Sequence, residues 1–255
     1  MPVQLLSCDE SPSFLAQVKG LLPPGAVTAL RRTRLAPQDS PLLGFRERRV
    51  IEAAVPRRRQ EFVAGRQAAH DCLEQLGQHA RALAPDANRA PEWPPGTTGS
   101  ISHSNDLCLA VAALRTSVDS IGLDIETASS LSRELWPLVL TRPELLWLEE
   151  LAEPERIGWA TLLFSAKESV YKCQYQRTRA YVDFQEVSVH IDAAARTFHV
   201  SFDRPVLDRP VRGRFARSGG YVVTLGFVVP ESSRASSSSS TAAAVRTKSS
   251  SRILM

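Results

Sequence analysis

Apolar residues recur at helical spacing in three stretches of the chain. The first stretch runs from about Pro56 to Leu76, where apolar side chains return every three or four residues. Gly77 follows it directly, and glycine is the commonest residue at a helix end. Further along, the same kind of pattern predicts a helix around residues 143–151 and a longer one over about 155–173.

Short apolar runs bounded by turn residues predict strands after each of these helices. In the first half they lie at about 98–103 and 107–114, with a third strand through Ile125 after a turn at 117–120. In the second half they lie near 186–191, 197–202, 211–216 and 221–229. Because short turns join antiparallel strands, we predict an α+β fold in which each half is a helix followed by an antiparallel sheet.

The division between the halves is predicted near residue 118. Residues 1–118 would form the N-terminal half and residues 119–230 the C-terminal half. The first 44 residues show only scattered apolar stretches around a Pro-Pro-Gly sequence. Residues 231–255 contain an unbroken serine run, 236–240, and few large apolar residues, which predicts a disordered tail.

Composition narrows the class of protein. With 43% hydrophobic residues among 255, the chain can bury one large core or two modest ones. It contains no run of eighteen apolar residues and no basic-then-apolar signal pattern at its start, so we expect a cytoplasmic protein without a membrane span. The four cysteines form no C-x-x-C pair, which is typical of reduced, buried thiols.

Arginine is concentrated in the first third of the chain. Between Arg31 and Arg66 there are ten arginines against four acids, an excess of six that exceeds the net charge of +4 for the whole chain. A solvated basic face or a nonspecific nucleic-acid patch is the plainer interpretation. The exclusive use of arginine favours phosphate, because guanidinium groups bind phosphate oxygens in pairs.

Two short motifs carry acidic residues at informative spacings. In Ile121-Gly122-Leu123-Asp124-Ile125-Glu126, the two carboxylates alternate with apolar residues and so share one face of a strand. In the second motif, residues 164–172 (FSAKESVYK), Glu168 and Lys172 are four apart and share a helix face, with Lys167 adjacent to Glu168.

Three carboxylates from two elements suit Mg²⁺, a hard cation that is often completed by substrate phosphates. Taken singly, an Asp-x-Glu sequence is more often a solvated strand edge, and Lys-Glu pairs on helices are ordinary surface charges. The apolar residues that flank Asp124 and Glu126 favour a site, because they predict that one face of the strand is buried.

These motifs resemble those of 4′-phosphopantetheinyl transferases of the Sfp type, nearest to the branch of enterobactin synthase component D. The family's (I/V)-G-(I/V/L)-D-(I/V)-E and F/W-S-x-K-E-S/A-x-x-K segments appear as IGLDIE and FSAKESVYK. Residues 57–77 resemble its arginine-rich helix, and residues 93–104 (WPPGTTGSISHS) its tryptophan-proline loop and Ser-His strand. The resemblance covers most of residues 45–229.

The resemblance implies a fold of two similar halves related by pseudo-twofold symmetry, with the site between them. It implies Mg²⁺-dependent transfer of phosphopantetheine from coenzyme A to a serine of an acyl, peptidyl or aryl carrier protein, by a monomer that binds no nucleic acid. Glu168 would be the general base, directly or through a water, and Lys172 would steady the pyrophosphate. Metal ligands would be Asp124, Glu126 and Glu168. Coenzyme A would be bound by Arg58, Arg59, Arg66, Arg89, Ser102, His103, Asp124, Lys167 and Lys172.

Three alternatives stay open at this point. A lone histidine such as His103 is more often a hydrogen-bonded structural residue than a ligand. A basic nucleic-acid-binding protein would explain the arginines but not the spaced carboxylates. A catalytically degenerate homologue is also possible in principle, although the four motif charges are all present. His70 stands where the family often has another arginine, which puts one coenzyme A contact in doubt.

Overall fold

Two antiparallel sheets form the centre of the molecule. The computed structural model describes residues 12–32, 45–79 and 82–231. The three-stranded sheet has the order β1 (Ala26–Arg32), β3 (Leu107–Leu114), β2 (Thr97–Ser104). The five-stranded sheet has the order β4 (Ser120–Thr127), β8 (Tyr221–Val228), β7 (Arg212–Ser218), β6 (Thr197–Phe202), β5 (Val187–Asp192).

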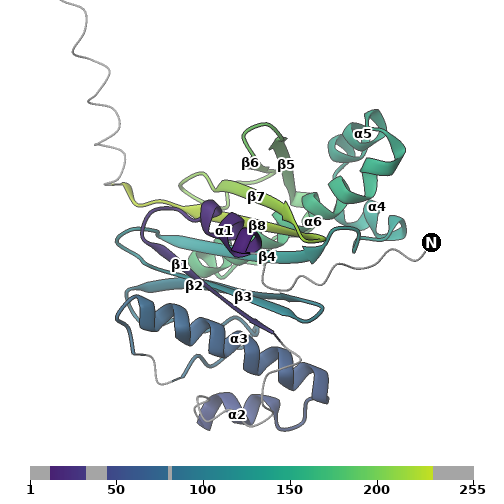
Figure 1. The fold of residues 1–255 in the computed structure, drawn as a ribbon. Helices are drawn as coiled ribbons and strands as arrows, with labels where there is room; N and C mark the ends of the chain where they lie inside the picture. Colours follow the sequence, from purple (N-terminus) through teal and green to yellow (C-terminus); the bar gives the residue numbers. More distant parts are fainter. Residues whose placement is uncertain (1–11, 33–44, 80–81, 232–255) are drawn as a thin grey trace, which may run out of the picture.

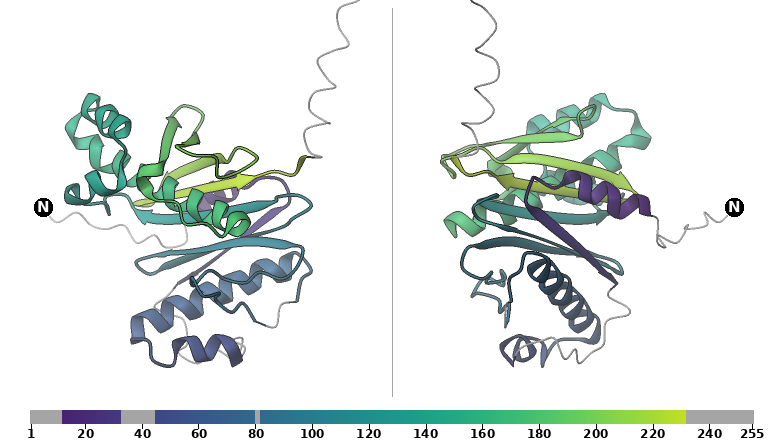
Figure 2. Two further views of the ribbon diagram at one scale, coloured as in Figure 1. Left: turned by 180° about the vertical axis from the view of Figure 1, so that it is seen from behind. Right: turned by 60° about the vertical axis from the view of Figure 1, so that its left-hand side comes forward.

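The sheets are stacked, and a helix covers the outer face of each (Figures 1 and 2). Helix α3 (Pro56–Gln75) packs on the three-stranded sheet and α6 (Glu153–Thr178) on the five-stranded one. Shorter helices lie around these layers: α1 (Pro12–Leu21), α2 (Phe45–Ile51), α4 (Trp136–Val139) and α5 (Arg142–Glu150), with 3₁₀ turns η2 (Arg133–Leu135) and η3 (Phe184–Glu186).

The alternation of side chains along β3 explains this stacking. Leu107, Leu109 and Val111 face the core between the two sheets, which also contains Leu123 of β4 and Leu225 of β8. The small residues Ala110 and Ala112 face the other way and pack under α3. A strand buried on both faces has the continuous apolar run that the sequence shows here.

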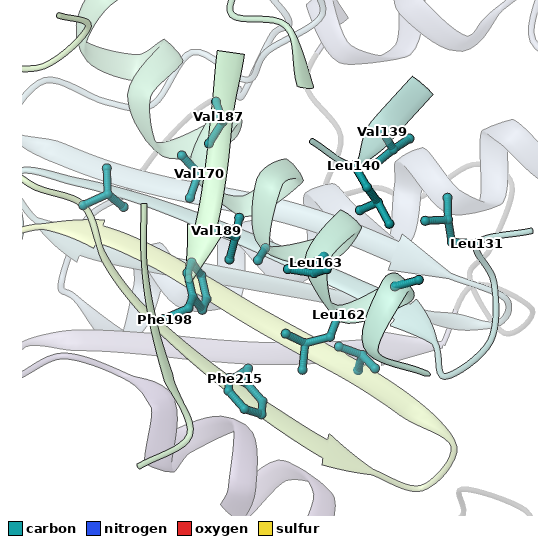
Figure 3. Packing of buried hydrophobic residues seen from close by; sticks show 14 of the residues in the cluster. Leu131, Val139, Leu140, Leu162, Leu163, Val170, Val187, Val189, Phe198 and Phe215 are labelled. Atoms are coloured by element: carbon teal, nitrogen blue, oxygen red, sulfur yellow. The ribbon is translucent and has the colours of Figure 1, made fainter. Parts of the chain in front are cut away.

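A separate core lies under α6. Figure 3 shows Leu162, Leu163 and Val170 of this helix against Val189 and Phe198 of the five-stranded sheet. The helix is therefore held along its length by apolar contacts, which fixes the direction of its polar side chains.

The predicted α+β class, with antiparallel sheets and packed helices, is confirmed. The predicted helix over 155–173 is longer, Glu153–Thr178, and the predicted strands are present within a few residues. Helices α1 and α2 and strand β1 were not predicted, because each is short and gains its stability from tertiary packing rather than from its own pattern. Residues 232–255 of the predicted tail and Cys8, one of the four cysteines, lie outside the described residues. Within the described part of the chain, no helix is both long and apolar enough to cross a membrane.

The division at residue 118 stays a prediction. The segment before it supplies α3 and the three-stranded sheet, and the segment after it supplies the five-stranded sheet and α6. The core between the sheets takes residues from both segments.

Candidate active site

The two acidic motifs meet where the edges of the two sheets lie side by side. Strand β2 is at the edge of one sheet and β4 at the edge of the other. Ser100 Oγ donates to Leu123 O at 3.4 Å, and Ser102 Oγ donates to the Asp124 carboxylate at 2.8 Å. The Ser-His strand and the Asp-x-Glu strand are thus held together by direct hydrogen bonds between polar side chains and the neighbouring strand.

Gly122 allows α6 to lie close above β4. A Cβ atom at this position would be 1.9 Å from Ser169 O and 2.6 Å from Cys173 N, both backbone atoms of α6. Only glycine fits at that separation. Since Asp124 follows on the same face of the strand, this close approach places its carboxylate next to α6.

Asp124 is the buried centre of the site. Its side chain is 4% exposed, and its Oδ1 accepts hydrogen bonds from Lys172 Nζ at 2.6 Å and from Ser102. Its Oδ2 is buried and has no hydrogen-bond partner among the described residues. A buried carboxylate oxygen without a donor is costly, so it indicates a place for a cation.

Glu126 and Glu168 crowd negative charge around the same point. Burial, and then repulsion by Asp124, raise the pKa of Glu126 to about 7. Burial also raises the pKa of Glu168, although the Lys172 ammonium opposes this effect. Burial disfavours the charged form of Lys172 in turn, but the carboxylates of Asp124 and Glu168 outweigh it and the pKa of Lys172 is raised. The site therefore holds three carboxylates and one ammonium.

These residues fit a cation that takes part of its coordination from elsewhere. The described residues contain no group of three or more His, Cys, Asp or Glu side chains close enough to hold a metal ion by themselves. The donors are all carboxylate oxygens, and the free Oδ2 of Asp124 is among them. Mg²⁺ binds through one or two carboxylates together with waters and substrate phosphates, so the donor set matches that cation.

Lys167 lies on a different side of α6 from Lys172, and its contact with the phosphates stays a prediction. Its ammonium is buried, pairs with Glu144 Oε2 at 2.8 Å, and donates to Val139 O at 2.8 Å and Phe184 O at 2.9 Å. Glu144 also accepts from Thr141 N and Val189 N, both at 2.7 Å. Lys167 thus joins α6 to α5 and β5.

A larger hollow lies between α2, α3, the end of β2 and the loop that precedes β2. Its volume is about 420 Å³, and it is lined by Arg58, Arg66, Arg89 and His103 among other residues. Arg58 donates to His103 Nε2 at 3.0 Å and to Glu61 at 3.4 Å. Burial lowers the pKa of His103, against the attraction of Glu61, so the ring is neutral near pH 7.

The arginines of α3 do not all face this hollow. Arg66 does, but its Nε donates to Leu83 O at 2.7 Å, and burial lowers its pKa to about 10. Arg59 does not line the hollow, and its role toward coenzyme A stays a prediction: it donates to Ala54 O at 2.8 Å and to Glu52 O, beyond the end of α2. Arg59 therefore stabilises the segment that connects α2 and α3. His70 lies 3.4 Å from the buried Glu47.

Two smaller hollows continue from the large one toward Glu168. One, of about 250 Å³, shares Arg89, Pro91 and Ile101 with the large hollow and reaches Glu168 and Lys172. The other, of about 220 Å³, shares Glu168 and Tyr171 with the middle hollow. Val170, Phe184 and Phe202 form an apolar part of its wall, and Lys167 also lines it.

Comparisons with known proteins identify the family. A model of the 4′-phosphopantetheinyl transferase N-terminal domain matches residues 46–113, and a model of the 4′-phosphopantetheinyl transferase superfamily matches residues 120–225. The chain belongs to the 4′-phosphopantetheinyl transferase superfamily. The two matched ranges contain the arginine-rich helix and both acidic motifs of this transferase.

The transferase is similar to enzymes from several bacteria. It is 36% identical over 219 residues to 4′-phosphopantetheinyl transferase Svp of Streptomyces mobaraensis, covering 81% of this chain and 87% of the relative. It is 34% identical over 180 residues to enterobactin synthase component D of Salmonella typhi, covering 69% and 74%. A solved holo-[acyl-carrier-protein] synthase from Thermotoga maritima matches with a TM-score of 0.36 and 12% identity over 42% of this chain and 61% of that chain, a likeness too weak to argue from.

The resemblance to the Sfp type with relatives of the enterobactin branch is therefore confirmed. The transferase moves phosphopantetheine onto carrier proteins, with coenzyme A as its substrate.

Sequence reasoning missed several residues of the transferase's site. Tyr171, Tyr175 and Arg179 line the hollow beside Lys172. They continue the helix face of Glu168 and Lys172 at spacings of three and four residues, so extending that motif by two turns would have found them. Trp93, also in this hollow, lies against Gly99 of β2, where a Cβ would be 2.4 Å from the indole ring.

Proposed function

We propose that this site transfers the 4′-phosphopantetheine group of coenzyme A to a serine of an acyl, peptidyl or aryl carrier protein, with Mg²⁺, and releases adenosine 3′,5′-bisphosphate. The observation that carries the proposal is the buried Asp124 carboxylate, held by Lys172 and Ser102 on one oxygen and free on the other. Such a centre suits a cation that is completed by pyrophosphate oxygens.

The three hollows match the three parts of coenzyme A in order. The large hollow, with Arg58, Arg66, Arg89 and His103, suits the phosphorylated nucleotide, because guanidinium groups bind phosphate strongly. The middle hollow brings the pyrophosphate to Lys172. The apolar hollow beyond Glu168 suits the pantetheine arm, which has few charges to satisfy.

The reaction follows from the groups around Asp124. The serine oxygen of the carrier attacks the β-phosphorus, the bond from that phosphorus to the bridging oxygen breaks, and its electron pair leaves with the nucleotide. Glu168 takes the serine proton, directly or through a water, and its raised pKa suits a base that works near neutral pH. Lys172 would offset part of the pyrophosphate's charge, and Ser102 donates to Asp124 and so orients it.

Asp124 would hold Mg²⁺, with Glu126 and Glu168 binding it directly or through water, because the three carboxylates as they stand are too far apart to form a metal-binding group by themselves. When bound, the ion would neutralise charge that develops on the pyrophosphate oxygens. Without the ion, the carboxylates and the incoming phosphates would repel one another, since Lys172 offsets only part of the carboxylates' charge.

Intact mass spectrometry tests this proposal. Apo carrier proteins incubated with the transferase, coenzyme A and Mg²⁺ should gain the mass of one phosphopantetheine group, and a chelator should abolish the gain. Glu168→Gln should lower the rate by about 10²–10⁴-fold, as for loss of a general base. Glu74→Gln, an exposed residue in the last turn of α3, is the matched control and should leave the rate unchanged. Coenzyme A binding without transfer to any carrier would instead support a degenerate homologue.

The pathway and the cell compartment belong to the same proposal. Since similar enzymes include enterobactin synthase component D, we propose a carrier of siderophore or other secondary metabolism, to be ranked by relative rates on different carriers. We also propose a cytoplasmic monomer, in keeping with the buried thiols of Cys108 and Cys173. Cell fractionation would check the compartment, and light scattering would check the oligomeric state.

Nucleic acid is not among the proposed partners. Arg59 and Arg66 donate to backbone carbonyls, so these two guanidinium groups stabilise the fold rather than belonging to an open basic face. Salt-dependent binding to nonspecific DNA with micromolar affinity would contradict this view.

A further inference from the structure

The loop before β2 is a tight turn built around Asp86. Pro85 and Pro91 form an isolated antiparallel bridge, and Asp86 N donates to Ala90 O at 2.8 Å. One oxygen of the Asp86 side chain, Oδ1, accepts from the backbone N–H groups of Asn88 and Ala90, both at 2.9 Å. The turn is therefore closed from within by a single carboxylate oxygen.

The other oxygen of Asp86 faces α6. Its Oδ2 accepts from Arg179 at 2.7 Å and from the Tyr175 hydroxyl at 3.3 Å. The same hydroxyl accepts from the Asn88 side-chain amide at 2.6 Å, and the Arg179 guanidinium lies 5.3 Å from the centre of the Tyr175 ring. These contacts join residues almost ninety positions apart in the sequence, and they connect the loop to the helix that carries Glu168 and Lys172.

Arg89 lies at the centre of this turn with an unusual backbone. Its φ is 67°, in the left-handed region that a residue with a Cβ rarely adopts, and Arg89 N donates to Asp86 O at 3.0 Å. Its side chain lines both the large hollow and the middle one. The strained conformation persists only because the surrounding contacts hold the turn in this shape.

We propose that Asp86, Tyr175 and Arg179 form a clasp that positions Arg89 on the wall between the nucleotide and the pyrophosphate of coenzyme A. This inference rests on the proposed function of the site. The clasp should affect the affinity for coenzyme A and not the rate of the chemical step. Glu168 and Lys172 are positioned independently of it, by the packing of α6 on Gly122. Asp86, Tyr175 and Arg179 are thus positioning residues.

Two conservative variants cut the clasp and leave the turn intact. Asp86→Asn keeps one carbonyl oxygen to accept from Asn88 N and Ala90 N but replaces the acceptor of Arg179 by an amide, and Tyr175→Phe removes the hydroxyl alone. Each should raise the Kd for coenzyme A and for adenosine 3′,5′-bisphosphate by about tenfold, the usual effect of losing a hydrogen bond to a charged group. KM for coenzyme A should rise in the same ratio, and kcat should change less than about threefold.

Asp192→Asn is the matched control. Asp192 also accepts a backbone N–H, from Ala195 at 2.9 Å, in an exposed turn between β5 and β6. The affinity of the Asp192→Asn variant for coenzyme A should equal that of the wild type.

A double-mutant cycle with Arg89→Asn decides whether the clasp works through Arg89. Asparagine tolerates the left-handed conformation, so this variant removes the guanidinium and spares the turn. If the clasp acts by positioning Arg89, Asp86→Asn should add less than twofold to the Kd of Arg89→Asn. Additive losses, or a fall in kcat and thermal stability with KM unchanged, would overturn the inference while the transfer reaction stands. A wild-type protein that binds no coenzyme A would overturn the proposed function and the clasp together.

Discussion

Lys167 and Lys172 differ in what they neutralise, although both are on α6. Lys167 is 1% exposed and pairs with the buried Glu144, whereas Lys172 pairs with Asp124 at the centre of the site. Lys167→Met should therefore lower the free energy of unfolding by about 3–5 kcal/mol, because Glu144 is left buried without a cation. The folded fraction should still bind coenzyme A normally. Denaturant unfolding and calorimetric titration measure the two effects.

Lys172→Met provides the contrast to Lys167→Met, since it should remove turnover at saturating coenzyme A. If Lys167→Met instead lost coenzyme A affinity without losing stability, Lys167 would contact the cofactor as the sequence suggested.

The affinity for coenzyme A should depend on pH because of His103. Burial lowers its pKa in the free protein, with Glu61 opposing and Arg58 and Lys172 adding to the effect. A bound phosphate would favour the charged ring and raise the pKa. Affinity should therefore be greatest below the pKa of the free protein and fall as pH rises toward the pKa of the complex.

The measurement for His103 is the Kd of coenzyme A between pH 5 and 9, compared with His103→Asn. The variant removes the ring's titration but keeps that of the ligand's own phosphates, so the difference between the two curves belongs to His103. Parallel curves would show that the ring does not change its charge on binding.

At the scale of elements, the contact of α6 with β4 sets the geometry of the site. A methyl group at Gly122 would meet the backbone of Ser169 and Cys173, which cannot move without shifting the helix. Gly122→Ala should thus destabilise the protein by about 1–3 kcal/mol or more, and separate Lys172 from Asp124. Loss of stability and of turnover are both expected, by thermal unfolding and the transfer assay.

Gly158→Ala on the same helix is the control for Gly122→Ala. Its Cβ would lie 3.7 Å from Ala128 O, an ordinary contact. A helical glycine replaced by alanine should gain about 0.5–1 kcal/mol. If both variants behaved alike, the close approach at Gly122 would not be what holds the helix in place.

Helix geometry also explains which parts of the site could be predicted from sequence. Alternation along a strand and the four-residue repeat of a helix indicated that Asp124 and Lys172 belong to one site, and the structure joins them at 2.6 Å. Neighbours on a helix face different directions, about 100° apart, so Lys167 and Arg59 diverge from Glu168 and Arg58 despite their adjacency in the motifs. The contacts of Asp86 with Arg179 join distant segments, and no local pattern encodes such a pairing.

At the scale of the whole molecule, the core between the sheets decides how the chain unfolds. It takes Leu109 and Val111 from β3, Leu123 from β4, and Phe14 and Val18 from α1. Either half alone would expose one side of this core to water. We therefore expect residues 1–118 and 119–230 to unfold together and neither to be stable by itself.

Phe14→Ala tests this coupling from the N-terminal helix. Phe14 is 7% exposed, and its ring centre lies 6.1 Å from that of Tyr221 at the start of β8. Its truncation should cost about 3–5 kcal/mol, as for other buried phenylalanines. If the core is shared, amide exchange in the Phe14→Ala variant should become faster by the same factor in β3 and in β8. This result would be informative because Phe14 contacts a ring in β8, that of Tyr221, and none in β3. Lys19→Ala, an exposed change on the same helix, should leave both strands protected. Faster exchange confined to one sheet would contradict this expectation, because it would mean that the two halves unfold separately. The site between β2 and β4 would then be disrupted whenever either half unfolds.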